Sequence, residues 1–265
     1  KSLWAEKLLP FFTGLLESGI ESLPDEYIKA YELLSDWDAD MTPESVEATI
    51  FERYYVDFLF YLYSDELGED LFRELIKNDL LAANHMNRIR ISGESLFFDN
   101  KNTENVLETP EEIALNAFKA TIDSLISRLG DNPDEWQWGK VHTLTLAHPL
   151  GSVNILNRAF DLNRGPYAVG GSYHTVSPYS YPLTNLYKAN HGSSHRHIYV
   201  TGDWDQSRVI LPTGISGIPA SNFYCDQTED YLNYIYKKDA FSKENVNRSK
   251  SFEMEFIPEK TDLSD

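Results

Sequence analysis

Apolar side chains recur at helical spacing through the first third of the chain. In residues 3–18 this spacing predicts an amphipathic helix, because positions three and four apart share one face. The apolar positions of this face are Trp4, Leu8, Leu9, Phe12, Leu15 and Leu16. Thr42 followed by Pro43 is typical of an N-cap and first helical position. A long helix is therefore predicted to begin at Pro43, and its apolar positions over residues 46–62 form a wide face, which favours burial.

Two further helices are predicted before residue 131. One begins at Ser64 and ends near Leu80, with apolar positions that we expect to face inward. These positions are Leu67, Leu71, Leu75 and Ile76. Residues 91–108 are polar and predict a loop. The run Thr109–Glu112 then has the composition of a capping box, so a helix is predicted to about Gly130.

The pattern changes at Asp131, where Gly, Pro, Tyr and His become frequent and the helical period disappears. Residues 141–146 form a short strand-like run. Residues 197–201 and 207–211 flank a five-residue loop and predict a β-hairpin. Residues 251–256 alternate apolar and polar side chains, which predicts a strand with one face in water.

The predicted fold class is therefore α+β. A mainly helical part covers residues 1–130, and a part made of strands and long loops covers residues 131–265. No internal repeat or low-complexity linker separates them, so we expect one continuous polypeptide portion rather than two independent modules.

The amino-acid composition excludes some classes of binding partner. The formal charge is −19, which opposes binding to nucleic acid or to anionic lipid, and no apolar run reaches the length of a membrane span. We expect neutral small molecules or protein as partners. Cys225 is the only cysteine, so an internal disulfide is excluded and the redox compartment stays open. The first residues show neither a signal peptide nor a lipidation motif, so any targeting segment is expected outside this chain.

The segment Leu211–Gln227 is the most distinctive in the sequence. Its glycines and prolines exclude a helix, and the apolar side chains between them predict that the loop is buried. The run Gly214-Ile-Ser216-Gly217 resembles the elbow that carries a hydrolase serine, but Ile218 stands where the elbow needs glycine. A glycine-rich turn in which Ser216 makes local hydrogen bonds is the preferred interpretation.

Other candidate sites have simpler interpretations. His191, His195 and His197 have spacings that suit zinc on a helix or a strand, but Arg196 among them opposes a cation. Asp203-Trp-Asp205 begins like a calcium loop, yet Arg208 occupies the position that needs glycine. The preferred interpretation is a polar strand entry for the histidines and a solvated hairpin tip for Asp203-Trp-Asp205. We therefore expect no metal or cofactor site in this chain.

A corner formed by Trp136, Trp138, His142 and the turn His148-Pro-Leu-Gly151 has two interpretations. Two indoles beside a strand and a turn could line a pocket, or they could close a hydrophobic core. Composition favours the core. Cys225, with no base beside it in sequence, is expected to pack as a small hydrophobic residue.

Taken in order, these stretches resemble the C-terminal part of the large chain of penicillin acylases, a family of N-terminal-nucleophile hydrolases. The resemblance extends from about residue 1 to residue 258. The matching residues are Trp37–Met41 with Ser45 and Ile50-Phe51, Trp136-x-Trp138-Gly139 with His142, His148–Gly151, Gly170-Gly171 with Thr175-Val176, Ser194-x-Arg196, and Leu211–Pro219 with Ser221, Tyr224, Asp226 and Gln227.

The resemblance implies part of an αββα sandwich and an enzyme that hydrolyses linear amides, such as acyl side chains of β-lactams or acyl-homoserine lactones. In that family a serine at the start of the large chain attacks the amide carbonyl, and its own α-amine is the base. An asparagine and a backbone N–H stabilise the oxyanion. None of these segments matches this chain, so its catalytic groups are expected upstream.

The same resemblance implies roles that are structural for the matched residues. They are Trp138, His148, Gly151, Arg196, Gly214, Ser216, Gly217, Asp226 and Gln227. We expect Asp226 and Gln227 to satisfy backbone groups of the loop that they end. The implied partners are the small chain and the N-terminal part of the large chain, the implied substrate is a small-molecule amide, and calcium is implied for the full enzyme. A periplasmic or extracellular location is also implied.

Two alternatives complete the predictions. Loss of Lys1 would expose Ser2 as an N-terminal nucleophile, but Ser2 begins a predicted amphipathic helix rather than the buried strand that the family uses. The chain could instead be a freestanding acidic binding module that holds a small molecule or a protein. Its contacts would be Tyr167, Tyr173, Tyr179, Tyr181 and Tyr187.

Overall fold

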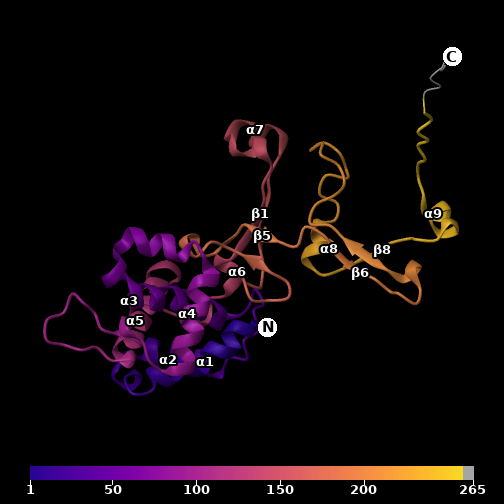
Figure 1. Cartoon of the computed structure of the whole chain (residues 1–265). Helices are drawn as coiled ribbons and strands as arrows, with labels where there is room; N and C mark the ends of the chain where they lie inside the picture. The colour runs from indigo at the N-terminus through magenta and orange to yellow at the C-terminus, as the bar shows by residue number, and fades with distance from the viewer. Residues whose placement is uncertain (259–265) are drawn as a thin grey trace, which may run out of the picture. The chain divides into compact units, whose positions relative to one another are not determined.

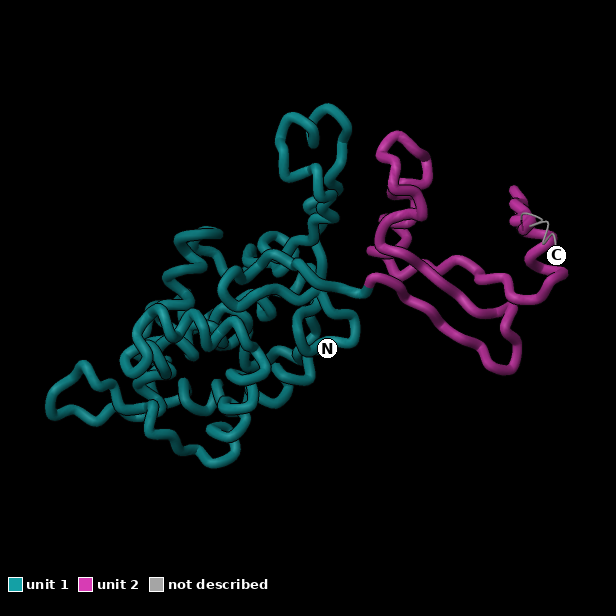
Figure 2. Tube along the Cα trace, turned by 45° about the horizontal axis from the view of Figure 1, so that its top comes forward, with its two compact units in different colours: residues 1–193 teal, residues 194–265 magenta. Residues whose placement is uncertain are grey.

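A computed structural model describes residues 1–258, and these fall into two compact units, residues 1–193 and residues 194–258 (Figure 2). This boundary differs from the predicted division at residue 130. The long helices do end there, at the end of α5, but the division into two parts at residue 130 stays a prediction. Within the described residues, no helix combines the length and the apolar character needed to cross a bilayer.

Unit 1 begins with a group of helices that pack on one another (Figure 1). They are α1 (Leu3–Leu16), α2 (Asp25–Asp36), α3 (Val46–Ile76), α4 (Asp79–Ser92) and α5 (Pro110–Leu129). The helix predicted over residues 3–18 is confirmed as α1. The predicted capping box is confirmed too, because the Thr109 hydroxyl accepts from the Glu112 amide and the Glu112 carboxylate accepts from the Thr109 amide.

The helical core forms where α1 and α5 pack against α3. The Phe12 ring centroid lies 4.7 Å from that of Tyr54 and 5.0 Å from that of Phe58. The Tyr54 hydroxyl donates to the carbonyl of Ala114 in α5 at 3.1 Å, which satisfies the one polar group of a fully buried ring. The wide apolar face predicted for residues 46–62 is therefore the centre of this core.

The start predicted for this helix is wrong. α3 begins at Val46 with Ser45 as its N-cap, and the Ser45 hydroxyl accepts from the Ala48 amide at 3.1 Å. The carbonyl of Pro43 instead accepts from the Gly139 amide at 2.7 Å. A tertiary hydrogen bond thus takes the peptide group that would have served the first helical turn.

The predicted break at Ser64 is also displaced. α3 continues to Ile76 across a kink at Gly68, whose φ of 67° is in the left-handed region that glycine adopts readily. Beyond the kink, Ile76 is buried as predicted, whereas Leu71 is 60% exposed and does not face inward. The rotation at Gly68 changes the face of the helix that meets the core.

Two helices, α2 and α4, lie outside the predicted set. α4 ends at Ser92, inside the segment predicted as a loop from residue 91, and a 3₁₀ turn covers Leu96–Phe98. The rest of residues 91–108 is irregular, as predicted.

Short strands complete unit 1, after the short helix α6 (Trp138–Val141). Strand β1 (Thr143–Leu146) pairs antiparallel with β2 (Arg164–Ala168) and parallel with β4 (Lys188–Ala189). Strands β3 (Tyr179–Ser180) and β5 (His191–Gly192) form a separate antiparallel pair. The strand predicted over residues 141–146 is thus confirmed for residues 143–146, whereas Val141 belongs to α6 and His142 is the C-cap of that helix. Between β1 and β2 the chain runs through helix α7 (Asn154–Phe160).

Unit 2 is built on the sheet β6-β7-β8. β6 (Arg196–Ile198) and β7 (Arg208–Ile210) confirm the predicted antiparallel hairpin, but both strands are shorter than predicted and residues 199–207 form the connection. β8 (Lys237–Lys238) pairs with β7. Helices α8 (Thr228–Leu232) and α9 (Lys243–Ser249) lie before and after β8 in sequence. The strand predicted over residues 251–256 is wrong, because this segment is unpaired and its apolar side chains are exposed.

Candidate functional site

The corner predicted around Trp138 is a buried polar cluster. The Trp138 ring stacks on the His142 ring with centroids 4.4 Å apart and planes inclined by 15°. The indole N–H of Trp138 donates to the Gly171 carbonyl at 3.0 Å, and both rings have no exposed surface. The indole N–H of Trp136, also fully buried, donates to the Gly130 carbonyl at 2.9 Å. Trp136, Trp138 and His142 therefore close the core and do not line an open pocket, whereas the turn at residues 148–151, predicted as part of the same corner, lies outside this core.

A carboxylic acid that the sequence analysis missed lies in the same cluster. Glu52 of α3 is only 6% exposed, and its carboxyl group accepts a hydrogen bond from the hydroxyl of Tyr181. Burial raises the pKa of Glu52 to about 7, although the hydrogen bond from the Tyr181 hydroxyl acts in the opposite direction. The signal that could have indicated it is its spacing, because Glu52 lies three positions before Tyr55 and seven before Leu59 and so falls on the predicted apolar face.

The ionisable groups of this cluster are shifted by burial and do not reach a substrate. Burial lowers the pKa of His142 to about 4, so its imidazole is neutral at pH 7. Burial also holds the pKa of Tyr181 well above its usual range. Because Trp138, His142 and Tyr181 are all fully buried, a substrate has no access to these groups. The cluster links α3 to the loop after Gly171, so its role is to stabilise the fold.

His148 and Gly151 lie in the segment between β1 and β2. The ring nitrogen Nδ1 of His148 accepts from the Leu150 amide at 3.1 Å and caps a 3₁₀ turn. A Cβ atom on Gly151 would lie 2.0 Å from Oδ1 of Asn163, so only glycine fits there without rearrangement. These contacts give both residues a local structural role, and their role in an enzyme stays a prediction.

Arg196 is fixed by tyrosines in unit 2. Its guanidinium carbon lies 3.8 Å from the ring centroid of Tyr231 and 4.6 Å from that of Tyr234. Its Nη1 donates to the Tyr231 carbonyl at 2.8 Å. A planar cation between aromatic rings is well suited to stacking, which holds β6 against α8 and the residues after it.

The loop Leu211–Gln227 is fixed at its base and exposed at its tip. At the base, the Gln227 side chain accepts from the Leu211 amide at 3.2 Å, and the Gln227 amide donates to the Thr213 carbonyl at 3.1 Å. The prediction that the loop is buried is wrong for unit 2 by itself, because Ile215 is 78% exposed and Ile218 65%. Contacts from outside the loop also hold its base, because the Thr228 hydroxyl of α8 donates to the Pro212 carbonyl at 2.9 Å.

Within this loop Ser216 has the predicted turn role. Its amide donates to the Phe223 carbonyl at 3.1 Å, and its hydroxyl accepts from the Ile218 amide at 3.1 Å. A Cβ atom on Gly214 would lie 2.0 Å from the Phe223 carbonyl oxygen, whereas Gly217 has open space around it. The side chain of Asp226 lies beside Gly214 and reaches Lys237 at 3.5 Å.

Metal-ligating side chains do not converge. Among residues 1–258, no three His, Cys, Asp or Glu side chains are grouped to hold a metal ion. His197 Nε2 lies 3.0 Å from an Asp239 carboxylate oxygen, and its ring stacks on Tyr199. Asp205 accepts from the amides of Phe241 and Ser242 at 2.8 Å each, and these bonds lower its pKa to about 2.

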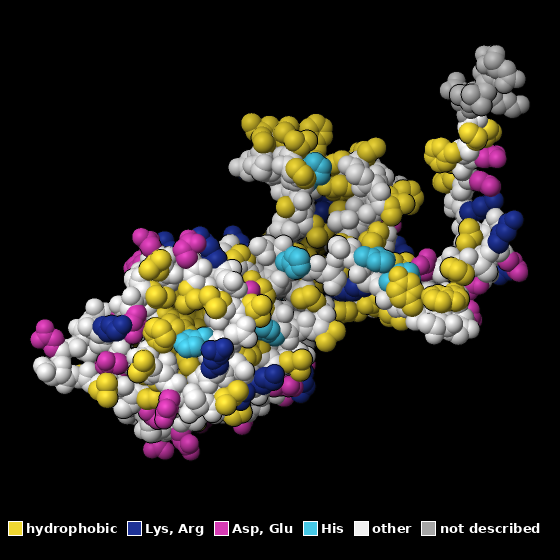
Figure 3. Space-filling model, viewed as in Figure 1, with side chains coloured by type: hydrophobic (Ala, Val, Ile, Leu, Met, Phe, Trp, Pro, Cys, Tyr) yellow, Lys and Arg dark blue, Asp and Glu magenta, His cyan; other side chains and the backbone are white. Residues whose placement is uncertain are grey.

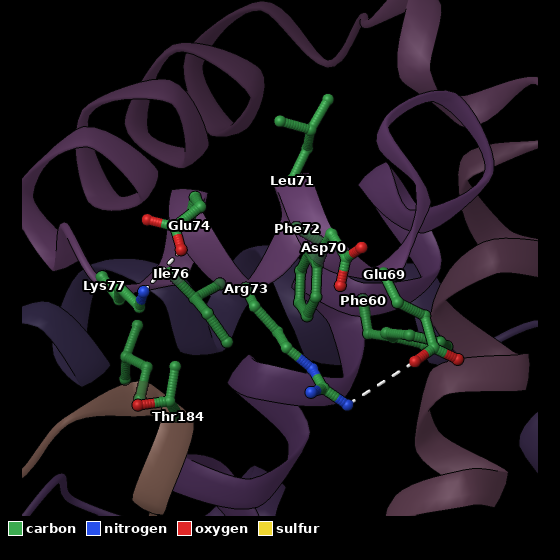
Figure 4. Close-up of a pocket in the computed structure, with 11 residues that line it drawn as sticks. Phe60, Glu69, Asp70, Leu71, Phe72, Arg73, Glu74, Ile76, Lys77 and Thr184 are labelled. Carbon is green, nitrogen blue, oxygen red and sulfur yellow. Dashed lines mark hydrogen bonds and ion pairs between the residues drawn. The ribbon is translucent and has the colours of Figure 1, made fainter.

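The structure also contains an open cavity of about 730 Å³ on unit 1 (Figure 4). It is lined mainly by the part of α3 that follows Gly68, and none of the predicted site residues contributes to it. Its charged side chains pair with one another, with Arg73 near Glu69 at 3.5 Å and Lys77 bonded to Glu74. The arrangement is that of a charged surface hollow and provides no nucleophile with a base.

Comparison with known proteins gives relatives of one kind. An acyl-homoserine lactone acylase, QuiP, of Pseudomonas fluorescens is 27% identical over 232 residues, which cover 83% of this chain and 27% of that protein. The QuiP acylase of Pseudomonas aeruginosa is 25% identical over 270 residues, covering 93% of this chain and 32% of that protein. A penicillin acylase 2 proenzyme of Pseudomonas sp. is 28% identical over 121 residues, covering 46% and 16%. The chain thus spans less than a third of the length of these curated relatives.

A solved structure extends the likeness to the fold. The thermostable penicillin G acylase of Alcaligenes faecalis matches 98% of this chain and 48% of its own, with a TM-score of 0.52 and 14% identity. The likeness and the order of the elements confirm the predicted α+β fold class. The family model of penicillin amidase matches residues 1–248. This match confirms the resemblance found in the sequence, and the chain belongs to the penicillin amidase family.

Proposed function

We propose that this chain is the C-terminal part of the large chain of an amidohydrolase that cleaves a linear amide. The observation that carries the proposal is that the family match covers residues 1–248, while the chain spans only 27–32% of two related acylases. Amide hydrolysis is the activity that the names of the family and of its relatives indicate. The substrate would be an acylated small molecule, such as an acyl-homoserine lactone or a β-lactam with an acyl side chain.

In this proposal the nucleophile is a serine at the start of the large chain, upstream of Lys1. The environment of Ser2 supports this location. Ser2 is 1% exposed, its amide donates to the Ala39 carbonyl at 2.8 Å, and its hydroxyl accepts from the Ala5 amide at 3.2 Å as the N-cap of α1. A hydroxyl that is buried and engaged as a helix cap is poorly placed to attack a substrate.

The partners would be the small chain and the N-terminal part of the large chain. Calcium, if the complete enzyme binds it, would be held by residues outside the described part of this chain. We further propose a periplasmic or extracellular location, which fractionation of the native source would test. The rival binding module has less support, because Tyr179, Tyr181 and Tyr187, three of its five proposed contacts, are at most 6% exposed.

The test is to isolate the protein from its native source and to determine the N-terminus of the chain that contains this sequence. We expect a much longer large chain that begins with serine, accompanied by a small chain, and turnover of a phenylacetyl or long-chain acyl amide. Changing that first serine to alanine should abolish turnover. The proposal fails if the native chain begins at Lys1, or if this chain alone hydrolyses the amide and loses that activity on Ser2→Ala or Ser216→Ala.

A further inference from the structure

Residues 147–163 form an arm between β1 and β2. The two strands pair from Thr143 with Ala168 to Leu146 with Arg164, and the chain beyond them continues through a 3₁₀ turn and α7 before it returns. Figure 1 shows this arm standing away from the helices of unit 1. The helices of unit 1 therefore do not cover the arm.

The arm has a defined shape that polar side chains fix from within. Asn163 is central, because its Oδ1 accepts from the His148 amide at 2.8 Å and its Nδ2 donates to the Gly151 carbonyl at 3.1 Å. Its own amide donates to Oδ1 of Asn157 at 2.8 Å, which ties α7 to the returning chain. These bonds order the arm before any partner is present, which lowers the entropic cost of binding.

The outer surface of the arm is apolar. No residue of α7, a helix that lies wholly within the described part of the chain, is buried. Ile155 is 79% exposed, Phe160 62%, Leu150 56% and Val153 49%. Figure 3 shows hydrophobic side chains gathered at the tip of the arm. Contiguous exposed apolar side chains of this kind mark interaction surfaces.

The charge pattern of this region differs from that of the rest of the chain. Between Trp136 and Ser193 the only acidic residue is Asp161, although the chain contains 42 Asp and Glu residues. The carboxylate of Asp161 is held by Arg164 at 2.8 Å. Depletion of carboxylates together with exposed aromatic and aliphatic side chains is typical of the centre of a protein interface.

We propose that the arm docks into an apolar groove on the remaining part of the large chain of the same enzyme. This proposal rests on the proposed function, because it requires that remaining part to exist. The family match supports this occupant, since the arm lies within residues 1–248 and the chain spans at most 32% of the two compared QuiP acylases. Most of the polypeptide of such an enzyme would thus be available to cover the arm. A second copy of this chain is the alternative occupant, and the coverage of the two acylases does not favour it.

The test uses the complete gene of the native source and compares two matched substitutions. Ile155→Asp places a charge on the arm, and Leu107→Asp places one on a loop side chain of nearly equal exposure, 77% against 79%. We expect Ile155→Asp to lower the yield of assembled, processed enzyme at least tenfold and Leu107→Asp to leave it within twofold. The circular dichroism of this chain produced alone should be unchanged by both substitutions, because neither side chain is buried. In the assembled enzyme, amides of residues 149–162 should exchange with solvent more slowly than in this chain alone.

The outcomes separate the two proposals. If the native gene encodes no upstream part, the proposed function fails and the docking proposal fails with it. If the upstream part exists and Ile155→Asp assembles like the unchanged enzyme, only the docking proposal fails. Formation of a dimer by this chain alone that Ile155→Asp abolishes would identify a second copy as the occupant and would also overturn the proposal.

Discussion

The hydroxyl of Tyr181 donates a hydrogen bond to the carboxyl group of Glu52, across 129 positions of sequence. This bond joins the central helix α3 to the loop between β3 and β4, and both groups are excluded from water. A buried carboxyl group that is retained in a core imposes a pH dependence on stability.

Glu52→Gln should therefore change how the stability of the chain depends on pH. The folded chain retains the Glu52 proton up to about pH 7, whereas an unperturbed glutamate has a pKa of 4.5. The carboxyl group therefore makes folding less favourable as the pH rises between these values. A shift of this size corresponds to on the order of 3 kcal/mol. We expect the advantage of Glu52→Gln over the unchanged chain to grow between pH 5 and pH 8 in urea unfolding. Glu69→Gln, on an exposed part of α3, should show no such growth.

Tyr181→Phe should destabilise the chain by about 1–3 kcal/mol, because it removes a donor from a buried acceptor. It should also raise the pKa of Glu52 further, since the bond from Tyr181 acts to lower that pKa. A double-mutant cycle with Glu52→Gln, read by thermal unfolding, measures the coupling, which we expect to be about 0.5–3 kcal/mol. Additive effects of the two substitutions would contradict a direct interaction.

Gly214→Ala and Gly217→Ala form a matched pair within one loop. The added methyl group at Gly214 would lie 2.0 Å from a backbone carbonyl oxygen, whereas that at Gly217 meets nothing within 4 Å. We expect Gly214→Ala to cost about 1–3 kcal/mol, as overpacking does, and to increase amide exchange around the base of the loop. Gly217→Ala should be neutral or stabilising by up to about 1 kcal/mol. Equal effects at both positions would show that the close approach of Gly214 to Phe223 does not hold the loop.

Arg196→Lys should weaken unit 2 although it keeps the charge. Lysine cannot stack as the planar guanidinium does on Tyr231, so we expect a loss of about 0.5–2 kcal/mol. Hydrogen exchange at β6 and β7 would report it. Arg248→Lys is the control, because Arg248 is 71% exposed and pairs with Glu244 at the surface, where a change of about 0.5 kcal/mol or less is expected. Similar exchange in both variants would exclude the stacking role.

Several local patterns predicted their elements correctly, although the Thr42-Pro43 start and the alternation over residues 251–256 did not. The α1 stripe and the Thr109 capping box depend on residues within four positions of one another, so the structure retained them. The hairpin of β6 and β7 was predicted for the same reason. The start of α3 was misplaced because the Pro43 carbonyl bonds to Gly139, 96 positions away, which no local pattern indicates. Leu71 was misassigned because the kink at Gly68 turns the helix.

The sequence by itself determined the family, the α+β class and the residues that mark the match, because these depend on residue types in a fixed order. Only the tertiary structure decided that Trp138 and His142 close a core, that Glu52 is buried beside Tyr181, and that the loop from Leu211 to Gln227 and the arm around α7 present apolar side chains to solvent in their own units. Burial depends on which segments meet in space, and a pattern of apolar residues does not distinguish a surface covered by its own chain from one that awaits a partner.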